Sequence, residues 1–190
     1  MSFLCPLHAG QQAFDTMFYR EYEIERIVRR AFDLARSRKG KLLSVDKADV
    51  LDTSRLWREV AHRVSGAYPD VELTDMLVED AAMRIVTAPA DIDVIVTENL
   101  FGDILAGETA AIAGFPGVLA SALLGGATPL FEPAHDTRSG IGGHGCVGPM
   151  AMLVAVELML RFALDRRSAA DALAASAARI AGRVDGLPDV

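Results

Sequence analysis

Apolar residues recur along the chain with two different spacings, and the segments of the two kinds alternate. A spacing of three to four residues predicts helices, whereas short runs that are apolar on both faces predict buried strands. The segments with helical spacing are residues 15–37, 52–64, 80–88, 102–113, 149–164 and 169–183. The strand-like runs are residues 42–45, 71–78, 92–97 and 130–131. This alternation predicts an α/β layered fold with a largely parallel sheet.

Residues that start and stop elements lie between these segments. Lys39-Gly40 is expected to end the first helix, since glycine commonly follows a helix C-terminus. Asp52, Thr53 and Ser54 offer side chains that can cap the next helix. Residues 114–126 are rich in glycine, proline and alanine and are expected to be irregular.

The composition is that of an ordinary globular protein. The chain has 190 residues, 51% hydrophobic and 24% charged, so it can bury a core and is not a disordered chain. A net charge of −7 argues against nucleic-acid binding. Residues 149–164, the longest apolar stretch, contain Glu157 and Arg161 and are too short to span a bilayer. Two cysteines and a start without a secretory signal favour a cytoplasmic protein.

Lys47 is the first candidate for chemistry, because it comes just after a predicted strand and before a predicted helix. Ligands of α/β proteins usually bind at the carboxyl ends of strands. A lysine that loses water there can have a lowered pKa and serve as a base. The alternative is a surface ion pair between Lys47 and Asp46 or Asp49.

Carboxylates follow two further strands. Asp103 is expected in the first turn of the helix after residues 92–97. There it either complements the helix dipole or binds a hard cation such as Mg²⁺ through its oxygens. Glu79 and Asp80 end another strand, and because neighbouring side chains diverge, only one of them is expected to reach a shared site.

A glycine-rich run in the second half of the chain invites a nucleotide-binding interpretation. Residues 140–145 match G-x-G-x-x-G, but they do not follow a strand directly, as a dinucleotide-binding turn should. A surface loop is therefore the preferred interpretation. His62 is interpreted as an ordinary helix residue, and no Cys/His spacing suggests zinc.

Seven segments in collinear order carry a resemblance to one known family. They are A-F-D-T at 13–16, Y-E-I-E-R-I at 22–27, S-V-D-K-A at 44–48, L-W-R-E at 56–59, Y-P-D-V at 68–71, N-L-F-G-D-I-L at 99–105 and E-P at 132–133. Together they closely resemble the 3-isopropylmalate dehydrogenases, a branch of the β-decarboxylating dehydrogenases. The resemblance runs over residues 13–181, so we treat residues 13–190 as one truncated domain and residues 1–12 as an unmatched leader.

The resemblance implies a reaction, its cofactors and its residues. Family members oxidise and decarboxylate a small 2-hydroxy acid with NAD and Mg²⁺ or Mn²⁺, a reaction of the type used in leucine biosynthesis. By this resemblance Lys47 is the catalytic base, and Asp103 and Glu79 are metal ligands, Glu79 reaching the metal across a dimer. Glu132 and His135 are then expected to line the coenzyme site.

The departures from the family pattern raise an alternative. The chain resembles only the C-terminal half, so the N-terminal half, with its substrate-binding arginines and catalytic tyrosine, is expected to be absent. A second metal aspartate is replaced by Gly107, and an asparagine after the lysine by Asp49. At two positions where family members carry polar side chains that contact the coenzyme, this chain has Gly140 and Gly148. The alternative is an impaired fragment, a pseudoenzyme or a non-catalytic subunit.

The expected truncation also predicts association. A sheet that lacks its neighbouring strands exposes edges and apolar surface, and both favour contacts with other chains. We therefore expect a homodimer, or a complex with a chain that supplies the missing half.

Overall fold

The computed structural model describes residues 13, 15–113, 119–134 and 149–181, which divide into two compact units. The first unit comprises the chain up to Ala81 together with Ala88–Glu98, and the second comprises Ala82–Thr87 and the chain from Asn99 onward. No helix among the described residues is long and apolar enough to cross a membrane.

The first unit is built on a three-stranded parallel sheet. The strands are β1 (Lys41–Asp46), β2 (Glu72–Leu77) and β3 (Val94–Thr97), in the order β2-β1-β3. This confirms the prediction of an α/β fold with a parallel sheet. The register pairs Asp46 with Leu77 and Val45 with Thr97, so the three strands end together at their carboxyl edge.

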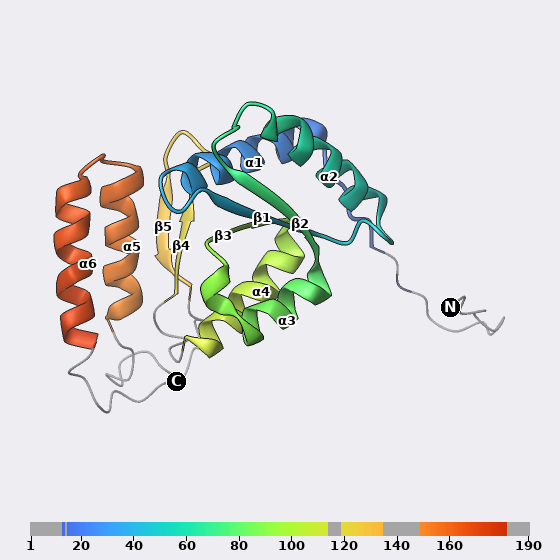
Figure 1. Ribbon diagram of the computed structural model, residues 1–190. Coiled ribbons are helices and arrows are strands. Elements are labelled where there is room, and N and C mark those ends of the chain that lie inside the picture. The colour runs from blue at the N-terminus through green and yellow to red at the C-terminus, as the bar shows by residue number, and fades with distance from the viewer. Residues whose placement is uncertain (1–12, 14, 114–118, 135–148, 182–190) are drawn as a thin grey trace. The chain divides into compact units, whose positions relative to one another are not determined.

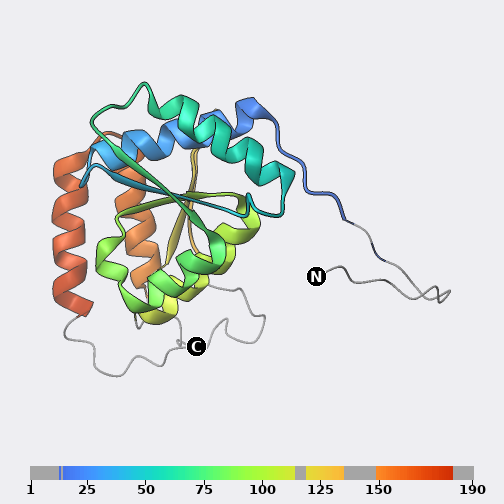
Figure 2. The same ribbon diagram turned by 45° about the vertical axis from the view of Figure 1, so that its right-hand side comes forward.

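Two helices, α1 (Glu21–Arg36) and α2 (Asp52–Ser65), lie side by side over one face of this sheet (Figure 1, Figure 2). Their buried stripes meet the sheet in one hydrophobic cluster. Within it Phe32 stacks on Tyr68 with ring centroids 4.7 Å apart, and Tyr19 meets Trp57 edge-on at 6.4 Å. The helix α3 (Val78–Thr87) follows β2, and the short 3₁₀ helix η1 (Pro89–Asp91) leads to β3.

The end of α1 shows why the chain turns where the sequence predicts. Gly40 has a φ of +70°, and a Cβ there would lie 3.3 Å from the Asp70 carbonyl oxygen, so a side chain would be strained. Its N–H donates to the Ala35 carbonyl at 2.9 Å. Glycine is thus favoured here.

The second unit contains α4 (Asn99–Ile112), an antiparallel pair β4 (Ala120–Leu123) and β5 (Leu130–Pro133), and the helices α5 (Met150–Phe162) and α6 (Arg167–Ala181). Buried alanines on α5 and α6, such as Ala155 and Ala170, let the two helices pack closely. Arg161 joins them by donating to Asp171 at 2.7 Å while also bonding Glu157.

Three sequence predictions were wrong in detail. The first helix begins at Glu21 rather than near Asp15, because residues 15–20 form no regular secondary structure and Tyr19 packs against Trp57. The cap of α2 is Leu51, and Asp52, Thr53 and Ser54 lie inside its first turn. The irregular stretch predicted over residues 114–126 contains β4, whose small side chains give no alternating pattern.

Candidate functional site

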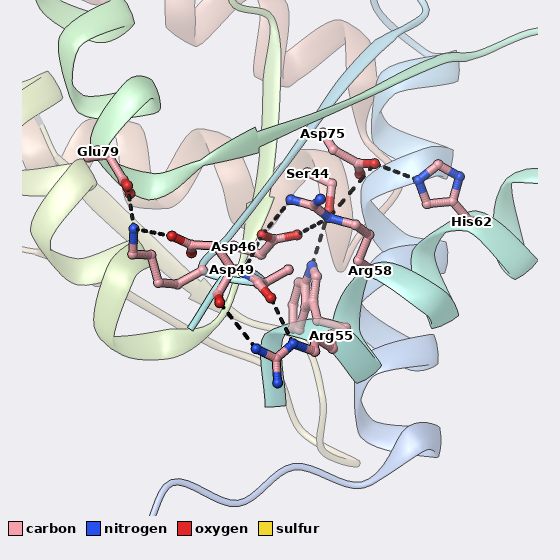
Figure 3. A network of polar contacts seen from close by, with 11 residues as sticks. Ser44, Asp46, Asp49, Arg55, Arg58, His62, Asp75 and Glu79 are labelled. Carbon is pink, nitrogen blue, oxygen red and sulfur yellow. Dashed lines mark hydrogen bonds and ion pairs between the residues drawn. The ribbon is translucent and has the colours of Figure 1, made fainter. Parts of the chain in front are cut away.

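The candidate site lies at the carboxyl end of the parallel sheet, where β1 and β2 finish next to each other. Lys47 follows β1 directly, and Glu79 lies in the first turn of the helix that follows β2. The Lys47 ammonium donates to the carboxylate of Glu79 and to Asp49 Oδ2, the latter at 3.1 Å. Figure 3 shows the two acceptors, Glu79 and Asp49, beside the polar network of β1. The register of the two strands therefore brings together two of the residues predicted for the site.

The charge state of Lys47 follows from these partners. Glu79 first, and Asp49 second, raise the pKa of the Lys47 ammonium above its usual range. In return, the hydrogen bond from Lys47 lowers the pKa of Glu79. The expectation of a lysine with a lowered pKa is therefore wrong for the protein without ligands. The ion pair between Lys47 and Asp49 is present as the sequence suggested. Of the adjacent carboxylates Glu79 and Asp80, Glu79 is the one that bonds Lys47.

Asp46 does not pair with Lys47, because its side chain points to the opposite face of the strand. It is 1% exposed, and a carboxylate so buried needs strong partners. Arg58 supplies them by donating Nε to Oδ2 and Nη2 to Oδ1, each at 2.8 Å. Two residues earlier on the same face, Ser44 accepts the indole N–H of Trp57 at 3.1 Å.

The network continues from Arg58 to β2. Arg58 Nε lies 3.9 Å from Asp75 Oδ2, and the same oxygen bonds His62 Nε2 at 2.5 Å. His62 is thus an exposed helix residue hydrogen-bonded to Asp75, in line with its ordinary interpretation. Sequence reasoning missed this network, although the alternation of polar residues at positions 44 and 46 in an apolar strand was a signal for it.

A small hollow opens beside this edge of the sheet. It is lined by side chains from the segment before α1, from β1 and α2, and from the residue after β3: Tyr19, Val45, Asp46, Thr53, Ser54, Trp57 and Glu98. Tyr19 donates its hydroxyl to Glu98 Oε2 at 2.9 Å, and Glu98 is 6% exposed. A second buried carboxylate therefore lies at this edge, another feature that sequence reasoning missed.

Asp103 lies in the second unit, on α4, and its side chain is exposed. Because α4 begins at Asn99, Asp103 is in the second turn, and the first turn holds no acidic residue. The interpretation of Asp103 as a partner of the helix dipole is therefore wrong. Gly107 follows one turn later on the same face, and a Cβ there would meet no atom within 4 Å.

The predicted coenzyme residues fall in the same unit. Glu132 lies in β5, where it pairs in register with Ser121, and it is exposed. His135 lies outside the described residues, as do the glycine-rich run 140–145 and Gly148.

Glu79 and Asp103 offer the carboxylate oxygens that Mg²⁺ and Mn²⁺ prefer, and both side chains are accessible, so the donor type fits a divalent ion. Within the described part of the chain, however, no three His, Cys, Asp or Glu residues form a group that could hold a metal.

Comparisons with known proteins agree on one family. The family described as isocitrate/isopropylmalate dehydrogenase matches residues 5–183. The 3-isopropylmalate dehydrogenase of Nitratidesulfovibrio vulgaris is 51% identical over 88% of this chain and 47% of its own length. That of Moorella thermoacetica is 44% identical over 95% of this chain and 51% of its own length. The chain thus spans about half the length of these curated relatives.

A solved structure supports the same relationship. The crystal structure of isocitrate dehydrogenase from Methylococcus capsulatus superimposes with a TM-score of 0.77 at 37% identity. The match covers 82% of this chain and 46% of that one.

Proposed function

The chain belongs to the isocitrate/isopropylmalate dehydrogenase family, and from this premise we propose that it carries part of a 3-isopropylmalate dehydrogenase-type site. The proposed reaction is the NAD-dependent, metal-assisted oxidation and decarboxylation of a small 2-hydroxy acid, as in leucine biosynthesis. The observation that carries the proposal is the meeting of Lys47 and Glu79 at the carboxyl end of β1 and β2.

Lys47 is the residue that moves a proton in this proposal. In the protein without ligands it is held protonated by Glu79 and Asp49. When Glu79 turns to another positive partner, the ammonium loses its main counter-charge, and the pKa of Lys47 falls. The free amine can then accept the proton of the substrate hydroxyl. The ion pair is thus the resting state of the base.

Asp103 is proposed to hold Mg²⁺ or Mn²⁺ together with Glu79 of a second copy across a dimer, and Glu132 and His135 are proposed to line the NAD site. When bound, the metal makes the substrate hydroxyl more acidic and the coenzyme accepts hydride. Asp103 presents its carboxylate from the exposed face of α4, and the hydrogen bond from Lys47 lowers the pKa of Glu79, which favours its carboxylate form.

A dimer, or a complex with a chain that supplies the other half of the family domain, is part of the proposal. Apolar side chains on α3 and α4 that are more than half exposed support it: Met83, Val86, Leu100 and Ile104. Surfaces of this kind mark protein contacts. A cytoplasmic location follows from the same family assignment and is equally a proposal.

A second candidate function is that of a non-catalytic or impaired subunit. Gly107 favours it, since a glycine brings no oxygen where the family resemblance implies a metal carboxylate. The lost ligand is expected to weaken metal binding by at least about tenfold.

The test is NADH formation from NAD with 3-isopropylmalate, isocitrate or tartrate in the presence of Mg²⁺. The chain is assayed alone and together with the separately produced first half of the Moorella thermoacetica relative. Turnover that the Lys47→Ala variant lacks supports the dehydrogenase. A stable complex without Lys47-dependent turnover in either arm rejects it and leaves the non-catalytic subunit.

A further inference from the structure

Arg58 binds the last residue of β1, Asp46, whose side chain points to the side opposite to Lys47. Its guanidinium binds both oxygens of Asp46 at 2.8 Å. Asp46 Oδ1 also accepts the N–H of Ala48 at 2.9 Å, two residues further along the chain. Such a side-chain contact to the backbone replaces a backbone turn and fixes its direction. The two residues that flank Lys47 are thereby bonded to each other through the carboxylate of Asp46.

Arg55 holds the remainder of the same turn. It donates Nε to the Ala48 carbonyl at 2.9 Å and Nη2 to the Asp49 carbonyl at 3.1 Å. Within the turn, the Lys47 carbonyl accepts the N–H groups of Val50 and Leu51. Figure 3 shows Arg55 and Arg58 reaching the turn from the same helix, α2.

The chemistry of arginine matters for this arrangement. A guanidinium is planar and donates in two fixed directions, so it sets the orientation of its acceptor, which a lysine ammonium does not. Both side chains are substantially exposed, at 52% for Arg55 and 36% for Arg58, so neither serves mainly to fill the core. Their polar contacts are to Asp46, Ala48 and Asp49 around the turn, to the neighbouring Asp52 and to the β2 residue Asp75.

We propose that Arg58 and Arg55 are positioning residues that fix the β1–α2 turn and thereby aim the Lys47 side chain at the position of Glu79. The inference rests on the proposed function, in which Lys47 is the base. It adds to that function the two side chains that keep the base in place. An amine displaced by about an ångström from its reacting atom can lose around a hundredfold in rate.

The test compares Arg58→Lys with Arg63→Lys. Arg63 is the matched control, since it lies on the same helix but pairs with Glu21 and Glu25 of α1. Hydrogen exchange of the Ala48 amide is expected to be about tenfold faster in Arg58→Lys, while that of the core residue Val28 is unchanged. In the turnover assay kcat falls at least about tenfold and KM changes little. Arg63→Lys resembles the unmodified chain throughout.

Unchanged exchange at Ala48 in Arg58→Lys would overturn the proposal. So would an equal acceleration at Val28, which would show a merely structural role, or an Arg63→Lys variant that behaves like Arg58→Lys. If Arg58→Lys does not fold, Arg55→Lys decides, with faster exchange expected at Val50 and unchanged exchange overturning the proposal. The exchange measurements need no turnover, so they give a result even if the proposed reaction is absent.

Discussion

The ammonium of Lys47 and the carboxylate of Glu79, from the ends of two neighbouring parallel strands, form one ion pair. We predict that Glu79→Gln lowers the pKa of Lys47 toward its ordinary value, since Glu79 is the main cause of the rise. NMR titration of the lysine side chain measures it. Asp80→Asn, which changes the adjacent carboxylate, serves as the control and should leave the titration unchanged.

How the stability from this ion pair depends on pH follows from the pKa changes of Lys47 and Glu79. The pKa of Lys47 is raised, so its contribution to stability is complete below about pH 10.4 and is lost as the pH rises through the folded-state pKa. The pKa of Glu79 is lowered, so its contribution is present above about pH 4.3 and is lost as the pH falls through the folded-state pKa. A Lys47 titration that is the same in Glu79→Gln would contradict the pairing.

The buried hydrogen bond from Trp57 to Ser44 supports a second prediction. Replacing Trp57 by Phe leaves the Ser44 hydroxyl without this donor and is expected to destabilise the fold by about 1–3 kcal/mol, in addition to the loss of ring volume. Urea unfolding of the single variants and of the double variant with Ser44→Ala measures the coupling. The double variant should lose less free energy of unfolding than the two single variants lose in sum. Strict additivity of the two losses would argue that the hydrogen bond contributes nothing.

A third prediction concerns acid. Burial raises the pKa of Asp93, but the Lys39 N–H and Arg38 outweigh it, and the pKa is lowered overall. Its contribution is therefore present above the unfolded-state value of about 3.9 and is lost as the pH falls through the folded-state pKa. Asp93→Asn should reduce the acid-induced loss of stability, followed by circular dichroism from about pH 5 downward, the lower edge of the usual range of maximal stability. If Asp93→Asn lost stability with falling pH in the same way as the unmodified chain, the proposed contribution of Asp93 would be contradicted.

A fourth prediction uses the open space at Gly107. Gly107→Asp places a second carboxylate one turn from Asp103, where its Cβ meets no atom within 4 Å. We expect Mn²⁺ to bind at least about tenfold more tightly than to the unmodified chain, by calorimetry. Gly107→Asn, which has the same size without the charge, is the control. Equal affinities for all three proteins would argue against a metal at Asp103.

Much of this fold could be predicted from the sequence because its strands are apolar and its helices amphipathic. The order of elements from β1 to α4 follows from this pattern, and Gly40 marks the end of α1. Residues 15–20 could not be assigned correctly, since Phe18 and Tyr19 match helical spacing, while Tyr19 bonds Glu98 from a segment without regular secondary structure.

The site was predictable in part. That Lys47 and Glu79 meet required the register of β1 and β2, which the sequence does not state. The partner of Asp46 is Arg58, twelve residues away, because a side chain next to Lys47 on a strand faces the other way. Of the two ion pairs that the sequence suggested for Lys47, the one with Asp49 is present and the one with Asp46 is not, for this reason.

The central claim is that the Lys47 amine is the base of a 2-hydroxy-acid dehydrogenase. The most direct measurement is NADH formation from 3-isopropylmalate by Lys47→Ala with added ethylamine, with the first half of a relative supplied if the chain needs it. We predict no turnover without the amine and a rate that rises with amine concentration, because a free amine can replace the missing base. Turnover by Lys47→Ala at the rate of the unmodified chain would contradict the claim.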